Sequence, residues 1–176
     1  MGVVVIALFS NNVQGLEGSI LLGISHGFVS PALFVCVGGI IYTRFHTRII
    51  AYLKGLANKT PLFSLLFFVF ILFNTAIPLS LNYLGEFLSL TGVFLQSPFI
   101  AVLGATGIVL SAAYSIWTFT RISYGSYSNY LLIQDINTEG KTIAPEVSQA
   151  RKTLLEYKNV NDINRREFYI LLTLFI

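Results

Sequence analysis

Long apolar runs without charge alternate with polar connectors along this chain. The first run of full length extends from residue 18 to 42 and contains no Asp, Glu, Lys or Arg and a single histidine, His26. A helix needs about 20 apolar residues to cross the hydrocarbon core of a bilayer. The run therefore predicts one complete transmembrane helix.

The stretch from residue 60 to 120 contains one formal charge, Glu86, and is long enough for three further spans. Its apolar residues run continuously from 62 to 73, are interrupted by Pro78 and several polar residues, and resume at 87–95. Lipid tolerates such an interruption only where protein or a water-filled cavity covers the freed backbone groups. We therefore expect a tight intramembrane turn and one discontinuous helix, within spans at about 61–77, 78–96 and 98–121.

Two connectors separate the apolar runs. Residues 44–60 carry four Lys or Arg and no acid, and they end before Pro61. This proline is expected to open the next helix, because its missing donor is harmless at the first helical position. Residues 122–166 form a polar connector, in which 146–157 predicts a surface helix. Because three spans would separate the connectors, we expect them on opposite sides of the membrane, so the positive-inside rule favours neither orientation.

Composition agrees with a membrane protein. Hydrophobic residues make up 55% of the chain, charged residues only 11%, and the mean hydropathy is +0.74, whereas soluble domains carry roughly a quarter charged residues. The apolar ends at 1–9 and 167–176 are too short to span, and we interpret them as partial spans of a larger membrane protein. The predicted fold class is an all-α integral membrane protein, a multi-span transmembrane helix bundle with one discontinuous helix.

Charge and cysteine content exclude several classes of site. The net charge of +3 comes from connector residues, so membrane topology explains it better than a nucleic-acid partner. The single cysteine, Cys36, cannot form an intramolecular disulfide or a thiolate cluster and is predicted to be a small buried hydrophobic residue. His26 and His46 have no third ligand within reach, so no metal site is expected.

Glu86 is the strongest candidate for chemistry, because a carboxylate near the middle of an apolar helix costs about 2.5–3.5 kcal/mol on insertion scales. At helical spacing Asn82 and Ser89 share its face and Tyr83 lies beside them. Gly85 would let a neighbouring backbone approach closely. A proton or ion site explains this placement. The alternative is a glutamate at a helix end that pairs with a connector lysine.

Polar positions in the neighbouring spans could complete such a site. His26 shares its helix face with Ser30, and an imidazole can relay protons near neutral pH, although it can equally well hydrogen-bond to a neighbouring helix. Ser111, Ser115 and Thr118 form one polar edge of the last span, which more often serves helix packing. Our hypothesis is that these polar stripes face one another and hold a chain of water through which the glutamate and the histidine exchange protons.

Five segments occur in a recognisable order: SHGF at 25–28, YTRFHTR at 42–48, NYLGEF at 82–87, AYS at 113–115 and YG at 124–125. In this order they resemble chain 4 of respiratory NADH-ubiquinone oxidoreductase, complex I. The tail DINRRE at 162–167 looks more like the mitochondrial members than the bacterial ones.

The resemblance implies a multi-pass, proton-pumping subunit of the mitochondrial inner membrane, related to subunits of multi-component sodium/proton antiporters. It implies that Glu86 lies on a discontinuous helix, that His26 lies near a hydrated central axis, and that the connector after Arg121 faces the matrix. It also implies that the chain covers only the last part of the subunit. The implied partners are the other membrane-arm subunits of complex I, the N-terminal part of the same subunit and membrane lipid.

The expected function is proton translocation coupled to quinone reduction, carried out by a non-redox subunit of NADH:ubiquinone reductase. The resemblance implies no cofactor in this chain, since FMN, the iron-sulfur clusters and ubiquinone belong elsewhere in the complex. Two alternatives stay open. The chain could be a subunit of a sodium/proton antiporter, or a structural remnant that seals the membrane arm without pumping.

Overall fold

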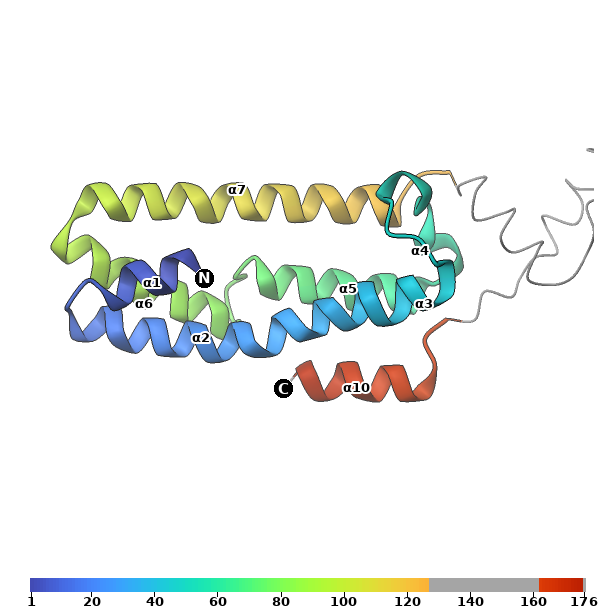
Figure 1. Cartoon of the computed structure of the whole chain (residues 1–176), viewed down its shortest axis with the longest axis horizontal. Coiled ribbons are helices and arrows are strands. Elements are labelled where there is room, and N and C mark those ends of the chain that lie inside the picture. The colour runs from blue at the N-terminus through green and yellow to red at the C-terminus, as the bar shows by residue number, and fades with distance from the viewer. Residues whose placement is uncertain (127–161, 176) are drawn as a thin grey trace, which may run out of the picture.

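The computed structural model describes residues 1–126 and 162–175, and every regular element in these residues is a helix (Figure 1). The elements are α1 (Gly2–Leu8), α2 (Val13–Phe34), the π-helical segment η1 (Val35–Ile41), α3 (Tyr42–Phe45), the short 3-10 turn η2 (Ile50–Tyr52), α4 (Leu56–Lys59), α5 (Pro61–Asn74), α6 (Leu81–Gln96), α7 (Pro98–Ser123) and α10 (Arg165–Phe175). The all-α class is confirmed for this part of the chain. The surface helix predicted at 146–157 lies outside the described residues.

The longest element is a continuous helical rod of 33 residues, Val13–Phe45, which consists of α2, η1 and α3. At 1.5 Å per residue the rod is about 50 Å long. α7 has 26 residues, and both helices are long and apolar enough to cross a membrane. Many large side chains of α7 are exposed, as Phe99 and Val109 show with 76% and 67% of their surface accessible. Such exposure is expected where lipid is the solvent.

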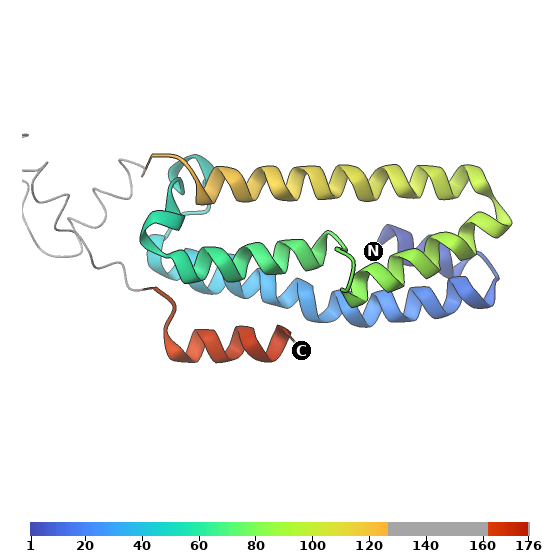
Figure 2. The same ribbon diagram turned by 180° about the vertical axis from the view of Figure 1, so that it is seen from behind.

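α5 and α6 lie end to end, and together they run antiparallel to the rod and to α7 (Figures 1 and 2). We expected two separate, compressed spans at 61–77 and 78–96. The structure instead has two half-length helices on one line, because α6 continues along α2 where α5 ends. The chain therefore crosses the bundle once between residues 61 and 96.

The break between α5 and α6 covers residues 75–80. Pro78 cannot donate the hydrogen bond that would continue the helix, and Ala76 and Leu79 have positive φ angles of 54° and 83°. Ser80 ends the break by capping α6, since its hydroxyl oxygen accepts a hydrogen bond from the Tyr83 amide (3.2 Å). The discontinuity expected from the sequence is thus present, with a defined cap on its second half.

Glycines allow α2 and α6 to approach until their backbones touch. A Cβ atom added to Gly85 would lie 2.8 Å from the Cα atom of Leu22, and one added to Gly92 would lie 2.5 Å from the Cα atom of Gly15. Ordinary contacts between carbon atoms are about 3.5–4.0 Å, so no larger residue fits without moving a helix. The close approach predicted at Gly85 is confirmed.

Both connectors begin and end at the same end of the bundle. Arg44, at the end of the rod, forms an ion pair of 2.6 Å with Glu167 at the start of α10, and Asp162 accepts hydrogen bonds from two amides at the start of α5. The expectation of opposite sides is therefore wrong, because residues 61–96 cross the bundle once and not twice. The cations of the described residues that follow α2 are Arg44, Arg48, Lys54, Lys59, Arg121, Arg165 and Arg166.

An apolar core fills the connector end. Cys36 is fully buried there among aromatic and aliphatic side chains that include Phe67, Phe70 and Leu171. The prediction that Cys36 is a buried hydrophobic residue is confirmed, as is the helix start at Pro61. This core joins α5 to the rod and leaves the region around the break as the more polar half of the bundle.

Candidate functional site

Glu86 lies on the second turn of α6 and lines a cavity of about 350 Å³. The cavity walls come from Met1 and α1, α6, α7 and the end of α5, and the polar side chains besides the half-buried carboxylate are Asn74, Thr75 and Ser111. The cavity is half open. A water molecule takes about 30 Å³, so several can fit. The arrangement suits an ionisable group that exchanges protons with water.

Asn82 ties three helices together at the break. The Ser25 hydroxyl of α2 donates a hydrogen bond to the Asn82 side-chain oxygen, and the Asn82 amide donates to the Phe73 carbonyl at the end of α5 (2.8 Å). Only 3% of the Asn82 surface is exposed. A second cavity of about 210 Å³ lies at this junction and is lined in part by Ser25, Ser80 and Asn82. Asn82 therefore holds the break in shape.

Glu86 lies at the edge of the expected polar stripe. Asn82 and Ser89 are buried, and Ser89 lies at the contact with α2, where its amide is the atom nearest to a Cβ added to Gly18. The Ser89 hydroxyl donates to the Glu86 backbone carbonyl (3.0 Å) and does not reach the carboxylate. Tyr83 is exposed and stacks on a neighbouring aromatic ring of α6. The stripe thus serves packing against α2, whereas Glu86 opens toward α1 and α7.

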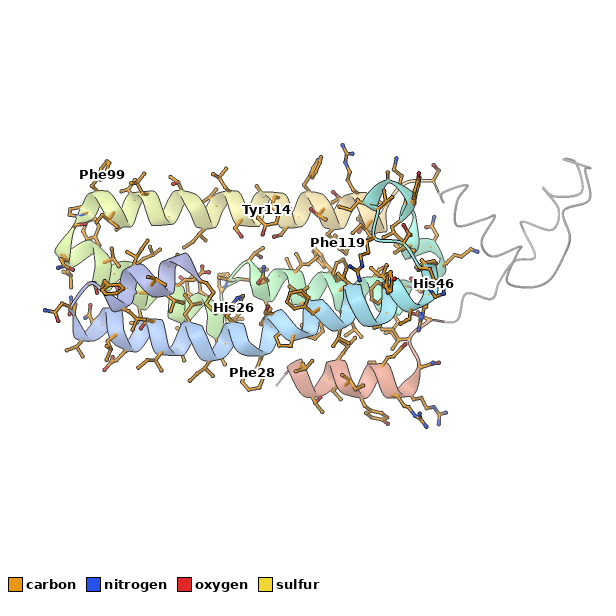
Figure 3. The ribbon with its side chains drawn as sticks, viewed as in Figure 1. His26, Phe28, His46, Phe99, Tyr114 and Phe119 are labelled. Atoms are coloured by element: carbon orange, nitrogen blue, oxygen red, sulfur yellow. The ribbon has the colours of Figure 1, made fainter. Side chains whose placement is uncertain are left out.

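His26 is half-buried and lies midway along the bundle, whereas His46 lies at the connector end (Figure 3). Among the described residues no hydrogen bond or ion pair is formed by the imidazole, and His26 does not line the cavity of Glu86. Ser30 lies one turn further along α2 and lines neither cavity at the break.

The hydroxyls of α7 divide between two roles. Ser111 lines the cavity of Glu86. Ser115 donates to the Ser111 carbonyl (2.8 Å) and Thr118 to the Tyr114 carbonyl (2.7 Å), so both bond within their own helix. The chain of water that we expected between the three polar stripes stays a prediction.

The sequence analysis missed three residues of this region. Asn74 and Thr75 bring polar groups into the Glu86 cavity, and Ser25 binds Asn82. The available signal was the end of the apolar run at residue 73, which marks the start of the break. Ser25 gave no signal of its own, because a serine in an apolar helix usually bonds within that helix.

Comparison with known proteins identifies the family. The family described as NADH:quinone oxidoreductase/Mrp antiporter, transmembrane, matches residues 1–111. The chain belongs to this family. The matched residues include α1, the rod, α5, α6 and the part of α7 up to Ser111. They therefore include both halves of the discontinuous helix.

Individual members of the family resemble the chain over most of its length. NADH-ubiquinone oxidoreductase chain 4 of Mycosarcoma maydis is 60% identical over 74% of this chain and 27% of the relative, and that of Wickerhamomyces canadensis is 39% identical over 99% and 30%. NADH-quinone oxidoreductase subunit M of Rhodobacter capsulatus is 42% identical over 84% and 29%. The chain thus spans less than a third of the length of these relatives, and the resemblance to chain 4 is confirmed.

A solved structure shows the same fold. A chain of the respiratory complex I of Thermus thermophilus, determined with bound NADH, superposes with a TM-score of 0.68 and 28% identity, over 90% of this chain and 32% of that one. The helical arrangement is therefore that of a complex I membrane subunit. The relatives similar in sequence include mitochondrial and bacterial proteins.

Proposed function

We propose that this chain forms part of the proton-translocating membrane arm of an NADH:ubiquinone oxidoreductase, and that Glu86 loads and releases the proton. The observation that carries the proposal is a half-buried carboxylate beside a 350 Å³ cavity, next to a helix break in an otherwise apolar bundle. An ionisable residue inside a membrane is costly and by default marks a functional site.

In the proposed mechanism, quinone reduction elsewhere in the complex changes the electrostatic field along the membrane axis. FMN, the iron-sulfur clusters and ubiquinone supply the redox chemistry in other subunits. The changed field alters the proton affinity of Glu86, and Asn74, Thr75 and Ser111 hold the water that carries the proton to and from it. His26 serves as a second relay, because an imidazole can accept a proton on one nitrogen and release one from the other.

The same proposal gives an orientation. Seven cations lie at the connector end of the described residues, and the positive-inside rule places that end on the inner side of the membrane. The similarity to mitochondrial relatives favours the inner mitochondrial membrane as the location. In that membrane the inner side is the matrix, so the connector end would face the matrix. The partners would be the remaining membrane-arm subunits, the N-terminal part of this subunit and lipid.

The test is Glu86→Gln in the intact complex, with proton uptake and NADH oxidation measured in the same vesicles. We expect the number of protons moved per NADH to fall, because a glutamine side chain cannot bind and release a proton in the place of the carboxylate. Glu86→Asp keeps the titratable group and should retain most of the activity. The matched control is Glu17→Gln. Glu17 is an exposed carboxylate near the start of the rod, at the end of the bundle opposite the connectors. Unchanged stoichiometry in Glu86→Gln would remove the proposed role.

A further inference from the structure

The amino end of α5 has no cap from its own neighbourhood. Pro61 opens the helix, so the next free amides belong to Leu62 and Phe63, and no acceptor within the helix is available to them. Thr60 precedes the helix, but its hydroxyl donates to the Leu56 carbonyl (3.0 Å) and does not cap it. Backbone donors left without an acceptor are costly where water is scarce.

Asp162 supplies both acceptors from a distant part of the chain. One carboxylate oxygen accepts from the Leu62 amide (2.9 Å), 100 residues away in sequence, and the other accepts from the Phe63 amide (3.1 Å). The negative charge of Asp162 also faces the positive end of the helix dipole, which adds to the stabilisation. The start of α5 is therefore capped by a residue that belongs to another element.

Further contacts hold Asp162 in place. Arg44 donates to the Asp162 backbone carbonyl (3.3 Å) and to the Glu167 carboxylate (2.6 Å). The same Glu167 oxygen accepts from the Asn164 amide (2.9 Å) at the start of α10. The ends of α3, α5 and α10 thus meet in one hydrogen-bonded cluster. We call Arg44, Asp162 and Glu167 the clasp.

α5 connects the clasp to the helix break. Its 14 residues extend about 21 Å at 1.5 Å per residue, and its far end brings Asn74 and Thr75 to the cavity of Glu86. Between these ends Phe67 and Phe70 are buried in the core. A close-packed helix moves as a body and does not deform gradually. A displacement of the start of α5 therefore also displaces the residues at the break.

We propose that Asp162 is a positioning residue for the Glu86 site, because it fixes the start of α5 and thereby the place where the helix breaks. It contacts neither Glu86 nor the cavity and acts only through α5. The functional consequence rests on the proposed role of Glu86. The geometrical part concerns α5 alone and can be tested without any assumption about protons.

The geometrical test is hydrogen exchange by mass spectrometry on the intact complex, with peptides that cover residues 61–66 and 73–80. Asp162→Asn removes the charge and replaces one of the two acceptor oxygens by an NH2 group, so one amide loses its acceptor. We expect roughly fivefold faster exchange at the start of α5, since a lost hydrogen bond costs about 1 kcal/mol, and also faster exchange at the break. Asp162→Glu keeps both acceptor oxygens and should restore the wild-type rates at both places. Glu17→Gln, which removes a carboxylate that caps no helix, should change neither.

Faster exchange confined to residues 61–66 would overturn the proposal, since Asp162 would then be a local cap only. Should Asp162→Asn fail to assemble, Glu167→Gln loosens the clasp through Arg44 while leaving the cap acceptors in place, and the same pair of peptides decides the outcome.

Proton translocation per NADH, measured on the same samples, separates this proposal from the role of Glu86. If proton translocation falls in Asp162→Asn and recovers in Asp162→Glu, the result supports both the positioning role of Asp162 and the role of Glu86 in proton transfer. If exchange at the break rises while translocation is unchanged, Asp162 positions the break but proton transfer does not depend on that position, and the functional part of the proposal fails; the role of Glu86 is decided separately by Glu86→Gln. If exchange at the break is unchanged, the positioning role fails whatever the pumping shows.

Discussion

Substituting alanine for Gly92 should force α2 and α6 apart. The added Cβ atom would lie 2.4 Å from the backbone nitrogen of Gly15 and 2.5 Å from its Cα atom. Because carbon contacts are about 3.5–4.0 Å, the helices must separate by on the order of 1 Å at this crossing. Overpacking typically costs about 1–3 kcal/mol. Alanine recovers about 1 kcal/mol through its helix propensity, so we expect a net loss of about 0–2 kcal/mol.

The matched control is Gly23→Ala in α2, the helix that Gly92 of α6 faces. A Cβ atom there meets nothing within 4 Å, so only the favourable propensity term of up to about 1 kcal/mol remains. The assay compares the thermal unfolding midpoints and the assembly yields of complexes that carry each variant. Gly92→Ala should melt below the wild type, and Gly23→Ala should melt at or above it. Equal midpoints for the two variants would refute the conclusion that backbone contact, and not general helix packing, holds α6 against α2.

Two further predictions concern buried polar and thiol groups. Asn82→Ala leaves the Ser25 hydroxyl buried without its acceptor and should destabilise the assembly by about 1–3 kcal/mol; adding Ser25→Ala should cost little more, and a thermal-unfolding double-mutant cycle with additive losses would contradict the link. Cys36 is fully buried, so a membrane-permeant maleimide should label it only after denaturation, whereas a cysteine placed at Ile49, which is exposed in the connector, should react in the folded complex because its thiolate can form in water; equal labelling rates would contradict the packing.

The sequence predicts the local features of this fold well, because each depends on a few neighbouring residues. Pro61 opens a helix since its missing donor is harmless there, and Cys36 is buried since its surroundings are apolar. Gly85 permits close approach, although the sequence does not reveal that Leu22 is the residue it meets.

The long-range arrangement could not be obtained in this way. The interruption after residue 73 has the same composition whether the chain turns back or continues on one line, and the choice depends on glycine contacts with α2. That choice decides whether the two connectors lie on the same side. Because we expected the chain to turn back, we placed the connectors on opposite sides. The capping of α5 by Asp162 joins residues 100 apart, and no local pattern marks it.

The candidate site shows the same division. Glu86 could be singled out because a lone carboxylate in an apolar run is costly. The partners proposed for it came from helical spacing alone, and spacing does not distinguish a face that meets a neighbouring helix from one that borders a cavity. Ser89 is on the first kind of face and Ser111 on the second, whereas Asn82 bonds to α2 and also borders the cavity at the break.

The short links at the end of the bundle opposite the connectors bear on how this protein enters a membrane. α6 and α7 are joined by Ser97 alone, and α1 and α2 by residues 9–12, and neither link contains a charge. Moving a Lys, Arg or Asp to the centre of a bilayer costs about 2.5–3.5 kcal/mol on insertion scales. Among residues 2–126, only Glu17 must be carried across to the far side, since Glu86 stops midway and every lysine and arginine remains behind. Helical hairpins with neutral tips can therefore insert from the connector side without transporting a single cation.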